Sequence, residues 1–182
     1  MIGGGSVRVA CPLIFHVEGG GSTPTSPLQL EFHETHLRTA RALNLEWHSR
    51  LPRFGRPQCR ICYAAQFDGL FYAIAIWTNP IARKLPQHEW IELNRMAIAP
   101  DAPKNTASRM LGWMAKDIRK RYAIVSRLIS YQDTDVHSGT IYKASGWVAT
   151  EMSKGGDWDR PSRMGRRAVA DGPKQRWEKL IR

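Results

Sequence analysis

The sequence is poor in cysteine and in long apolar runs, and each shortage excludes a class of protein. Three of its 182 residues are cysteine, an odd and sparse set that argues against a disulfide scaffold and predicts a reducing, cytoplasmic location. The longest uninterrupted apolar stretch, Leu70–Trp77, is far too short to cross a bilayer, so no membrane partner is expected. The N-terminus has no basic segment followed by an apolar core and a small-residue cleavage site, so no secretory signal is expected.

Acidic side chains are also few, at 16 Asp and Glu against 27 Lys and Arg, which leaves a formal net charge of +11. Such an excess favours polyanionic partners, although a small domain can also carry a basic surface without any partner. The excess leans toward the C-terminus, because nine basic residues accompany four acidic ones from Lys154 onward.

The remaining composition is sufficient for one folded domain, since 42% of the residues are hydrophobic and the length suits a single core. Glycine triplets at 3–5 and 19–21, followed by two prolines, predict a loosely ordered arm over residues 1–27 with a short strand near 11–17. The domain itself is expected over residues 28–152, and a basic C-terminal extension over 153–182.

The spacing of apolar residues predicts alternating strands and helices. Asp68-Gly69 between two apolar runs predicts a hairpin, because glycine supplies the positive φ of a tight turn. The predicted strands are 28–32, 61–66, 70–77, 90–99, 125–131 and 147–151. The predicted helices are 34–49, 106–121, 138–144 and a last one near 174–181. This order predicts an α/β fold with a mixed central sheet flanked by helices and a crossover helix in its middle.

The turn before the helix at 106–121 has the composition of an anion site. With Asn105 as N-cap, the first helical turn presents backbone N–H groups that have no partner within the helix. These donors and the helix dipole favour a phosphate, and two cations stand beside them. An ordinary capped helix with a proline-stiffened start would have the same composition, so both interpretations stand. The turn consists of Lys104, Asn105, Thr106, Ala107, Ser108 and Arg109.

Two stretches resemble the GNAT acyltransferase superfamily, within a match over roughly Leu28–Glu151. "IELNRMAIAPDAPKNTASRMLGWMAKDIRKR" stands where that fold has a strand that splays from its neighbour and a helix whose first turn holds the coenzyme A pyrophosphate. "SGTIYKASGW" is similar to the short helix that carries a tyrosine four residues before a glycine and an aromatic residue. The glycine-rich turn usual in the superfamily is replaced by "PKNTASR". The resemblance implies a GNAT-like fold and acetyl-CoA or a related acyl-CoA bound by the turn described above.

A narrower resemblance, to the Mom family of phage DNA-modifying proteins, covers most of the chain beyond residue 28. It rests on "LNRMAIAPDAPKNTASRMLGW", "RLISYQDTDVHSGTIYKASGW", "WHSRLP" and the tail "WDRPSR…GPKQRWE". Members of that family place a small carbamoyl-containing group on the exocyclic amine of adenine in DNA, which protects phage DNA from host restriction enzymes. The resemblance implies DNA with an adenine target, an acyl donor, and a phage-infected or prophage-bearing bacterial host.

The same resemblance places the active site on Arg95, Ser108, Asp133 and Tyr142. It implies that Arg95 holds a phosphate or polarises the transferred group, and that Ser108 completes the donor cradle. It also implies that Asp133 accepts a proton or a hydrogen bond from the adenine amine, and that Tyr142 protonates a leaving thiolate. Each residue taken alone also has an ordinary explanation: an ion-pair partner, a helix-start residue, a cap and a core-edge aromatic.

An adenine amine lies inside the duplex, so the enzyme has to extrude the base or accept single strands, and would then stack the base on aromatics. Trp47 with His48, at a helix end beside Arg50, is the favoured stacking site. The other aromatic candidates are Tyr63, Phe71, Tyr72 and Trp77. The tail is expected to bind phosphates without reading sequence, through Arg160, Arg163, Arg166, Arg167, Lys174 and Arg176. A buried aromatic and a solvated basic tail are the alternatives.

No metal site is expected. Cys59 and Cys62 form a C-x-x-C without a second pair, and an extended segment would send the two thiols to opposite faces. His33 and His36 lack a nearby third ligand.

Three functions stay open at this point. They are a Mom-type transferase, a GNAT N-acetyltransferase that uses acetyl-CoA on a protein or small-molecule amine, and a non-catalytic basic DNA-binding module. The basic excess favours DNA, and the missing glycine motif keeps the third alternative open. The sequence leaves the oligomeric state undetermined.

Overall fold

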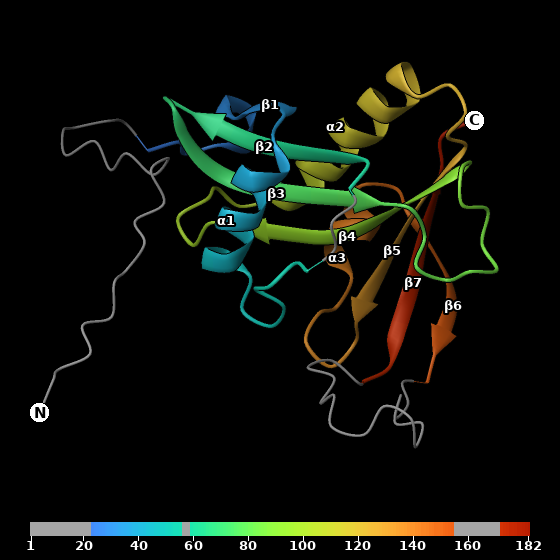
Figure 1. The fold of residues 1–182 in the computed structure, drawn as a ribbon. Coiled ribbons are helices and arrows are strands. Elements are labelled where there is room, and N and C mark those ends of the chain that lie inside the picture. The colour runs from blue at the N-terminus through green and yellow to red at the C-terminus, as the bar shows by residue number, and fades with distance from the viewer. Residues whose placement is uncertain (1–22, 56–58, 155–171) are drawn as a thin grey trace, which may run out of the picture.

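The computed structural model describes residues 23–55, 59–154 and 172–182, which form one twisted sheet with helices on both faces (Figure 1). The seven strands lie in the order β1-β2-β3-β4-β5-β7-β6. The strands are β1 Glu31–Glu34, β2 Ile61–Phe67, β3 Leu70–Thr78, β4 Trp90–Ile98, β5 Arg127–Asp133, β6 Val148–Ser153 and β7 Lys174–Leu180. The helices are η1 Pro27–Gln29, α1 Leu37–Trp47, α2 Thr106–Arg121 and α3 Thr140–Ala144. The predicted α/β fold with a mixed sheet and flanking helices is confirmed, since β4 and β5 are parallel and their neighbours antiparallel.

The two faces of the sheet have separate cores because side chains alternate along each strand. Tyr63 and Trp77 point into the core beneath α2, whereas Cys62 and Ile76 point into the core beneath α1. On α2 the buried residues recur at helical spacing, and they are Thr106, Met110, Leu111, Met114, Ala115 and Ile118. The crossover helix therefore lies on one face and α1 on the other. No helix in the described part of the chain is long and apolar enough to cross a membrane.

The predicted hairpin is confirmed. β2 and β3 pair antiparallel up to Phe67↔Leu70, and both turn residues have positive φ, 49° at Asp68 and 77° at Gly69. This pair of left-handed residues gives the tight turn whose twist matches the flanking strands.

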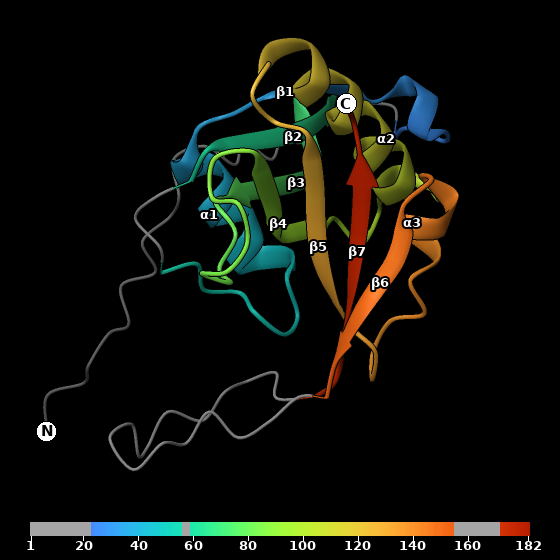
Figure 2. The same ribbon diagram turned by 90° about the vertical axis from the view of Figure 1, so that its right-hand side faces the viewer.

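The predicted helix near 174–181 is wrong, because this segment is β7 and pairs with β5 on one side and β6 on the other. Lysine, glutamine and glutamate favour a helix intrinsically, but two partner strands outweigh that preference. Figure 2 shows β5, β7 and β6 side by side, so the end of the predicted extension is part of the sheet. At the other end, the strand predicted near 11–17 lies outside the described residues.

Candidate active site

β4 and β5 are paired over only the first half of β4. Their parallel register runs from Trp90↔Arg127 to Leu93↔Ser130 and ends there. Beyond this point β4 still pairs with β3, and β5 still pairs with β7. The two strands therefore diverge like a fork, and backbone groups on the facing edges are free of the usual ladder. This fork is the splayed strand that the GNAT resemblance implies.

A cleft of about 400 Å³ opens at the fork, a volume typical of small-molecule sites. The lining comes from the facing edges of β4 and β5, the segment after α1, the start of α2, the segment leading into α3, and the start of β7. Seven of the predicted site residues line it together, namely His48, Arg50, Arg95, Ala107, Asp133, Tyr142 and Lys174.

Asp133 stands at the end of β5 and forms an ion pair with Arg50, at 3.1 Å between Oδ2 and Nη1. Its Oδ1 accepts the backbone N–H of Asp135 at 3.2 Å. Lys174 is its β7 neighbour in the register and also lines the cleft. This end of the cleft therefore combines a fixed carboxylate with two cations.

Arg95 is held from two sides. Its Nη1 donates to the backbone carbonyl of Asn94 at 2.7 Å and to the Asn94 side-chain oxygen at 2.9 Å. Its guanidinium lies over the ring of Phe54, 5.8 Å from the centroid, and Arg41 lies over the same ring at 5.6 Å. The guanidinium is thus presented to the cleft in one orientation, as recognition of an anion or a carbonyl requires.

His48 is a neutral hydrogen-bond donor in this site. Burial, and then the charges of Arg95 and His137, lower the pKa of His48 below its ordinary value of 6.5. Its Nδ1 accepts the backbone N–H of Leu51 at 3.3 Å, so the proton of the neutral ring lies on Nε2.

Tyr142 supplies a buried phenol at the base of the fork. Its hydroxyl lies 2.8 Å from Ser130 Oγ, and its ring stacks on Trp177 with centroids 5.2 Å apart and planes 12° apart. Burial raises the pKa of Tyr142, while the hydrogen bond with Ser130 acts to lower it. The phenol is therefore protonated at neutral pH and can donate a proton.

Gly139, which precedes α3, allows this packing. Its φ is +73°, and a Cβ there would come within 2.5 Å of both the Gln132 side-chain oxygen and the Trp177 ring. No other residue fits without moving the ring on which Tyr142 stacks.

The turn before α2 borders the cleft through Ala107. Asn105 is the N-cap, as predicted, but it caps without its side chain and has a φ of 67°. This left-handed conformation is usual for glycine, so the turn keeps a glycine-like backbone without a glycine. The N–H groups of Ala107 and Ser108 have no acceptor within the described chain. They remain available to an anion.

The other residues of the turn lie outside the cleft lining. Thr106 and Ser108 donate their hydroxyls to the carbonyls of Pro103 and Asn105. Arg109 lies over the ring of Phe32, 5.7 Å from its centroid, and Lys104 is exposed.

Most of the predicted base-stacking aromatics are buried or lie away from the cleft. Tyr63, Tyr72 and Trp77 are at most 2% exposed, so a base cannot stack on them and that interpretation is wrong. Trp47 and Phe71 pack against the core beneath α1 and do not line the cleft.

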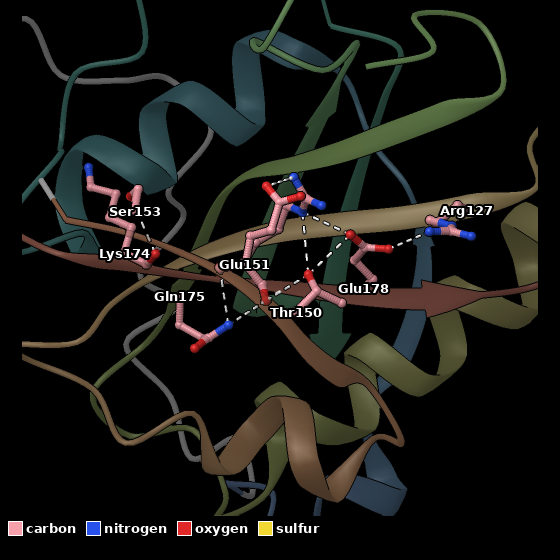
Figure 3. Close-up of polar contacts among 8 residues, drawn as sticks. Arg127, Thr150, Glu151, Ser153, Lys174, Gln175 and Glu178 are labelled. Carbon is pink, nitrogen blue, oxygen red and sulfur yellow. Dashed lines mark hydrogen bonds and ion pairs between the residues drawn. The ribbon is translucent and has the colours of Figure 1, made fainter. Parts of the chain in front are cut away.

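Arg176 is held within the sheet by ion pairs with two glutamates. Figure 3 shows these glutamates, Glu151 and Glu178, beside Thr150. Its guanidinium pairs with Glu151 and with Glu178, each at 2.8 Å, an arrangement that disfavours the predicted phosphate contact. Glu178 also accepts from Arg127 and Thr150. The other tail arginines, Arg160, Arg163, Arg166 and Arg167, lie outside the described residues.

The expectation that the thiols of Cys59 and Cys62 point to opposite faces is wrong, because their Sγ atoms lie 3.6 Å apart. β2 begins only at Ile61, so the alternation of a strand does not extend to Cys59. The described residues contain no group of three metal-ligating side chains.

Sequence reasoning did not identify Ser130, His137 or Thr140, which also line the cleft. The sequence did contain one signal. In "RLISYQD", Ser130 and Gln132 follow the buried Leu128 at every second position, so all three lie on the same face of the strand. Polar residues at core positions of a strand indicate a hydrogen-bonded site.

Several solved structures that resemble this chain are acetyltransferases. The ribosomal-protein-S18-alanine N-acetyltransferase from Escherichia coli matches with a TM-score of 0.59 and 12% identity, over 84% of this chain and 94% of that one. A GNAT-family acetyltransferase from Streptococcus pneumoniae gives 0.58 and 14%, over 84% and 99%. A Bacillus subtilis acetyltransferase in complex with CoA gives 0.54 and 12%, over 84% and 97%. These likenesses establish the GNAT fold.

Among curated proteins no sequence matches this chain. The profile of the Mom protein family, in contrast, matches residues 72–162, which run from β3 past the end of β6 and include the fork, α2 and α3. The chain belongs to the Mom protein family and has the GNAT fold.

Proposed function

We propose that this protein transfers a small carbamoyl-containing group to the exocyclic amine of adenine in DNA and so protects phage DNA from restriction. The observation that carries the proposal is the cleft at the fork, which joins a carboxylate between cations to a buried phenol. A transfer to an amine needs one group that takes a proton and another that gives one. Membership of the Mom family supports adenine in DNA as the acceptor.

The residues at the fork fit an acyl-CoA donor. The N–H groups of Ala107 and Ser108, at a helix N-terminus beside Lys104, suit a pyrophosphate. The unpaired edges of β4 and β5 suit the amides of an extended arm. The Bacillus subtilis acetyltransferase with this fold holds CoA. When bound, such a donor supplies a thioester whose carbonyl carbon is open to attack.

Tyr142 acts at the donor end. Its phenol is buried and protonated at neutral pH, so it can protonate the thiolate as the C–S bond breaks. Arg95, presented from β4, polarises the carbonyl under attack or holds a phosphate of the substrate.

Asp133 acts at the acceptor end. The lone pair of an adenine amine is delocalised into the ring, so the amine becomes nucleophilic only as a base withdraws one of its protons. The ion pair with Arg50 orients the Asp133 carboxylate for that role. His48, with its proton on Nε2, donates to a ring nitrogen of the extruded base. The cations Arg50 and Lys174 attract the DNA backbone to this end.

The test is to express the protein in bacteria, digest their DNA to nucleosides, and search by mass spectrometry for a heavier deoxyadenosine. We expect a new peak from the wild type, no peak from Asp133→Asn, and a full peak from Asp135→Asn. Asp135 is a matched control, because it is an exposed acid two residues along the same loop that does not line the cleft. Unmodified DNA from soluble, folded wild type would overturn the proposal.

The fold neighbours favour a second candidate, an N-acetyltransferase that acts on a protein amine. It predicts release of free CoA from acetyl-CoA and a peptide amine in the absence of DNA. The adenine proposal predicts no such release without nucleic acid.

A further inference from the structure

Ser130 occupies a special place in the fork. It is the last residue of β5 that is paired with β4, it is 2% exposed, and it lines the cleft. Its Oγ lies 2.8 Å from the Tyr142 hydroxyl and 3.4 Å from the carbonyl oxygen of Leu93. One hydroxyl therefore has two partners, a phenol and a fixed carbonyl.

Few other neighbours affect the protonation of the Tyr142 phenol. β7 covers its ring with Trp177, and Trp147 meets it edge-on at 5.6 Å. The cleft also contains Arg95, Asp133, His137 and Lys174, yet no charged group of the described chain shifts the pKa of Tyr142. Burial raises that pKa, and the Ser130 hydroxyl is the one neighbour that lowers it.

A serine hydroxyl donates one hydrogen bond and rotates freely about Cβ–Oγ. When Ser130 donates its one proton to the Leu93 carbonyl, the protonated phenol of Tyr142 has to be the donor to Ser130 Oγ. A phenolate cannot donate, so the hydrogen bond in this direction would be lost. Rotation of the Ser130 hydroxyl from the carbonyl to the phenolate supplies one strong hydrogen bond at that moment.

We propose that Ser130 is a positioning residue for proton transfer: its hydroxyl orients the Tyr142 phenol and then turns to donate to the phenolate. The inference rests on the proposed function, in which Tyr142 protonates the leaving thiolate. The step balances. The amine nitrogen bonds to the acyl carbon, the C–S bond breaks, and the phenol proton passes to sulfur. The proton lost by the amine leaves through Asp133, and the phenolate regains one from solvent.

The first test reads the phenol without any donor or DNA. We would place 3,5-difluorotyrosine, whose phenol is more acidic, at position 142 and follow its fluorine NMR signal against pH. Because the Ser130 hydrogen bond lowers the pKa of the phenol, Ser130→Ala should raise it by about one unit. Ser130→Thr keeps a hydroxyl on Cβ and should restore the wild-type value. An unchanged or lower pKa in a folded Ser130→Ala protein would overturn the proposal.

Ser145→Ala is the matched control for damage to α3. Ser145 donates its hydroxyl to the backbone carbonyls of Ile141 and Tyr142, at 2.8 and 3.2 Å, and not to the phenol. Its loss should leave the pKa of the fluorinated phenol unchanged. An equal shift in Ser145→Ala would show that helix displacement is the cause, which overturns the role of Ser130.

The second test follows DNA modification against pH. A general acid loses activity as pH rises through its pKa, so Ser130→Ala should move the alkaline limb upward by the shift seen in the NMR titration. The weaker acid should also lower the plateau rate about three- to tenfold. An alkaline limb that stays in place despite a shifted pKa would overturn the proposal. If wild type modifies no DNA at all, the proposed function fails, while the NMR titration still decides whether Ser130 controls the phenol.

Discussion

Phe54 is expected to control the activity of Arg95 from outside the cleft. Its ring is 8% exposed. The guanidinium of Arg95 lies 5.8 Å from the ring centroid, and that of Arg41 lies 5.6 Å from it. Phe54→Leu keeps most of the apolar volume but removes the ring face. Arg95 then retains its bonds to Asn94 and loses the surface against which it lies.

The expected sizes follow from these contacts. Both distances lie close to the outer limit of about 6 Å for a cation–π interaction, so each is worth about 0.5 kcal/mol. With about 1 kcal/mol for imperfect repacking of the smaller side chain, the free energy of unfolding should fall by about 1–2 kcal/mol. An arginine released from its position has to be ordered again at each turnover, at a cost of about 1.5 kcal/mol. This corresponds to roughly a tenfold loss of kcat/KM.

The assay is urea unfolding by tryptophan fluorescence, together with the initial rate of deoxyadenosine modification. Arg41→Gln is the control, because it removes the other cation from the same ring and Arg41 does not line the cleft. It should lose only about 0.5 kcal/mol of stability, for the single contact removed, and keep its rate. A wild-type rate in Phe54→Leu would refute the reasoning and assign the orientation of Arg95 to Asn94 alone.

Three further predictions concern stability and pH. Gly139→Ala should cost about 2 kcal/mol or more in urea unfolding, because the added Cβ meets Trp177 at 2.5 Å and φ is +73°; wild-type stability would contradict the tight packing. Burial acts to raise the pKa of Glu178, but its hydrogen bonds and ion pairs outweigh that effect and leave the pKa below its ordinary value of 4.5. Its stabilising contribution is therefore present above pH 4.5 and is lost as pH falls through the lowered pKa. Glu178→Gln should lower the unfolding free energy at neutral pH by about 1 kcal/mol. In acid, the unfolding free energies of the two proteins should become equal. A difference that does not depend on pH would exclude the charge of Glu178 as the cause. His48 has a pKa below 6.5, so the modification rate should fall in acid below pH 6.5, as His48 becomes protonated beside Arg95. The rate of His48→Gln should not show this fall. If the fall persists in His48→Gln, another group causes it.

The strongly periodic elements could be predicted from the sequence. The helix predicted at 106–121 is observed as α2 over Thr106–Arg121. Its buried stripe and the basic residues of its last turn both indicate a helix over the same range. The hairpin at Asp68-Gly69 was equally determined by local chemistry. β7 was not, because a strand of lysine, glutamine, arginine and glutamate is stabilised by partners that are distant in sequence. Its polar ladder, such as Arg176 with Glu178, exists only after the sheet has formed.

The candidate site shows the same division. Motif resemblance selected Arg95, Asp133 and Tyr142, and the structure brings them into one cleft. It did not select Ser130, because a serine within an apolar strand gains meaning only from the register that places it at the fork. The need to stack an extruded base suggested aromatic candidates such as Trp77, which is buried, because a sequence does not distinguish a tryptophan that faces a cleft from one that faces a core.

The fork also explains how one cleft can hold two chemically opposite ends. A continuous sheet separates its two faces, and alternation sends Ser130 of β5 toward α3 and Asp133 toward the segment after α1. Where β4 turns away from β5, the barrier between these faces is gone. The dry, aromatic surroundings that keep the Tyr142 phenol protonated and the ionic surroundings that fix Asp133 are therefore both retained, because each is built on its own face. A donor bound between the strand edges would have Asp133 on the α1 side and the Tyr142 phenol on the other side. Under the proposed function, the divergence of two strands, rather than any single residue, would allow Asp133 and Tyr142 to serve the same reacting carbon.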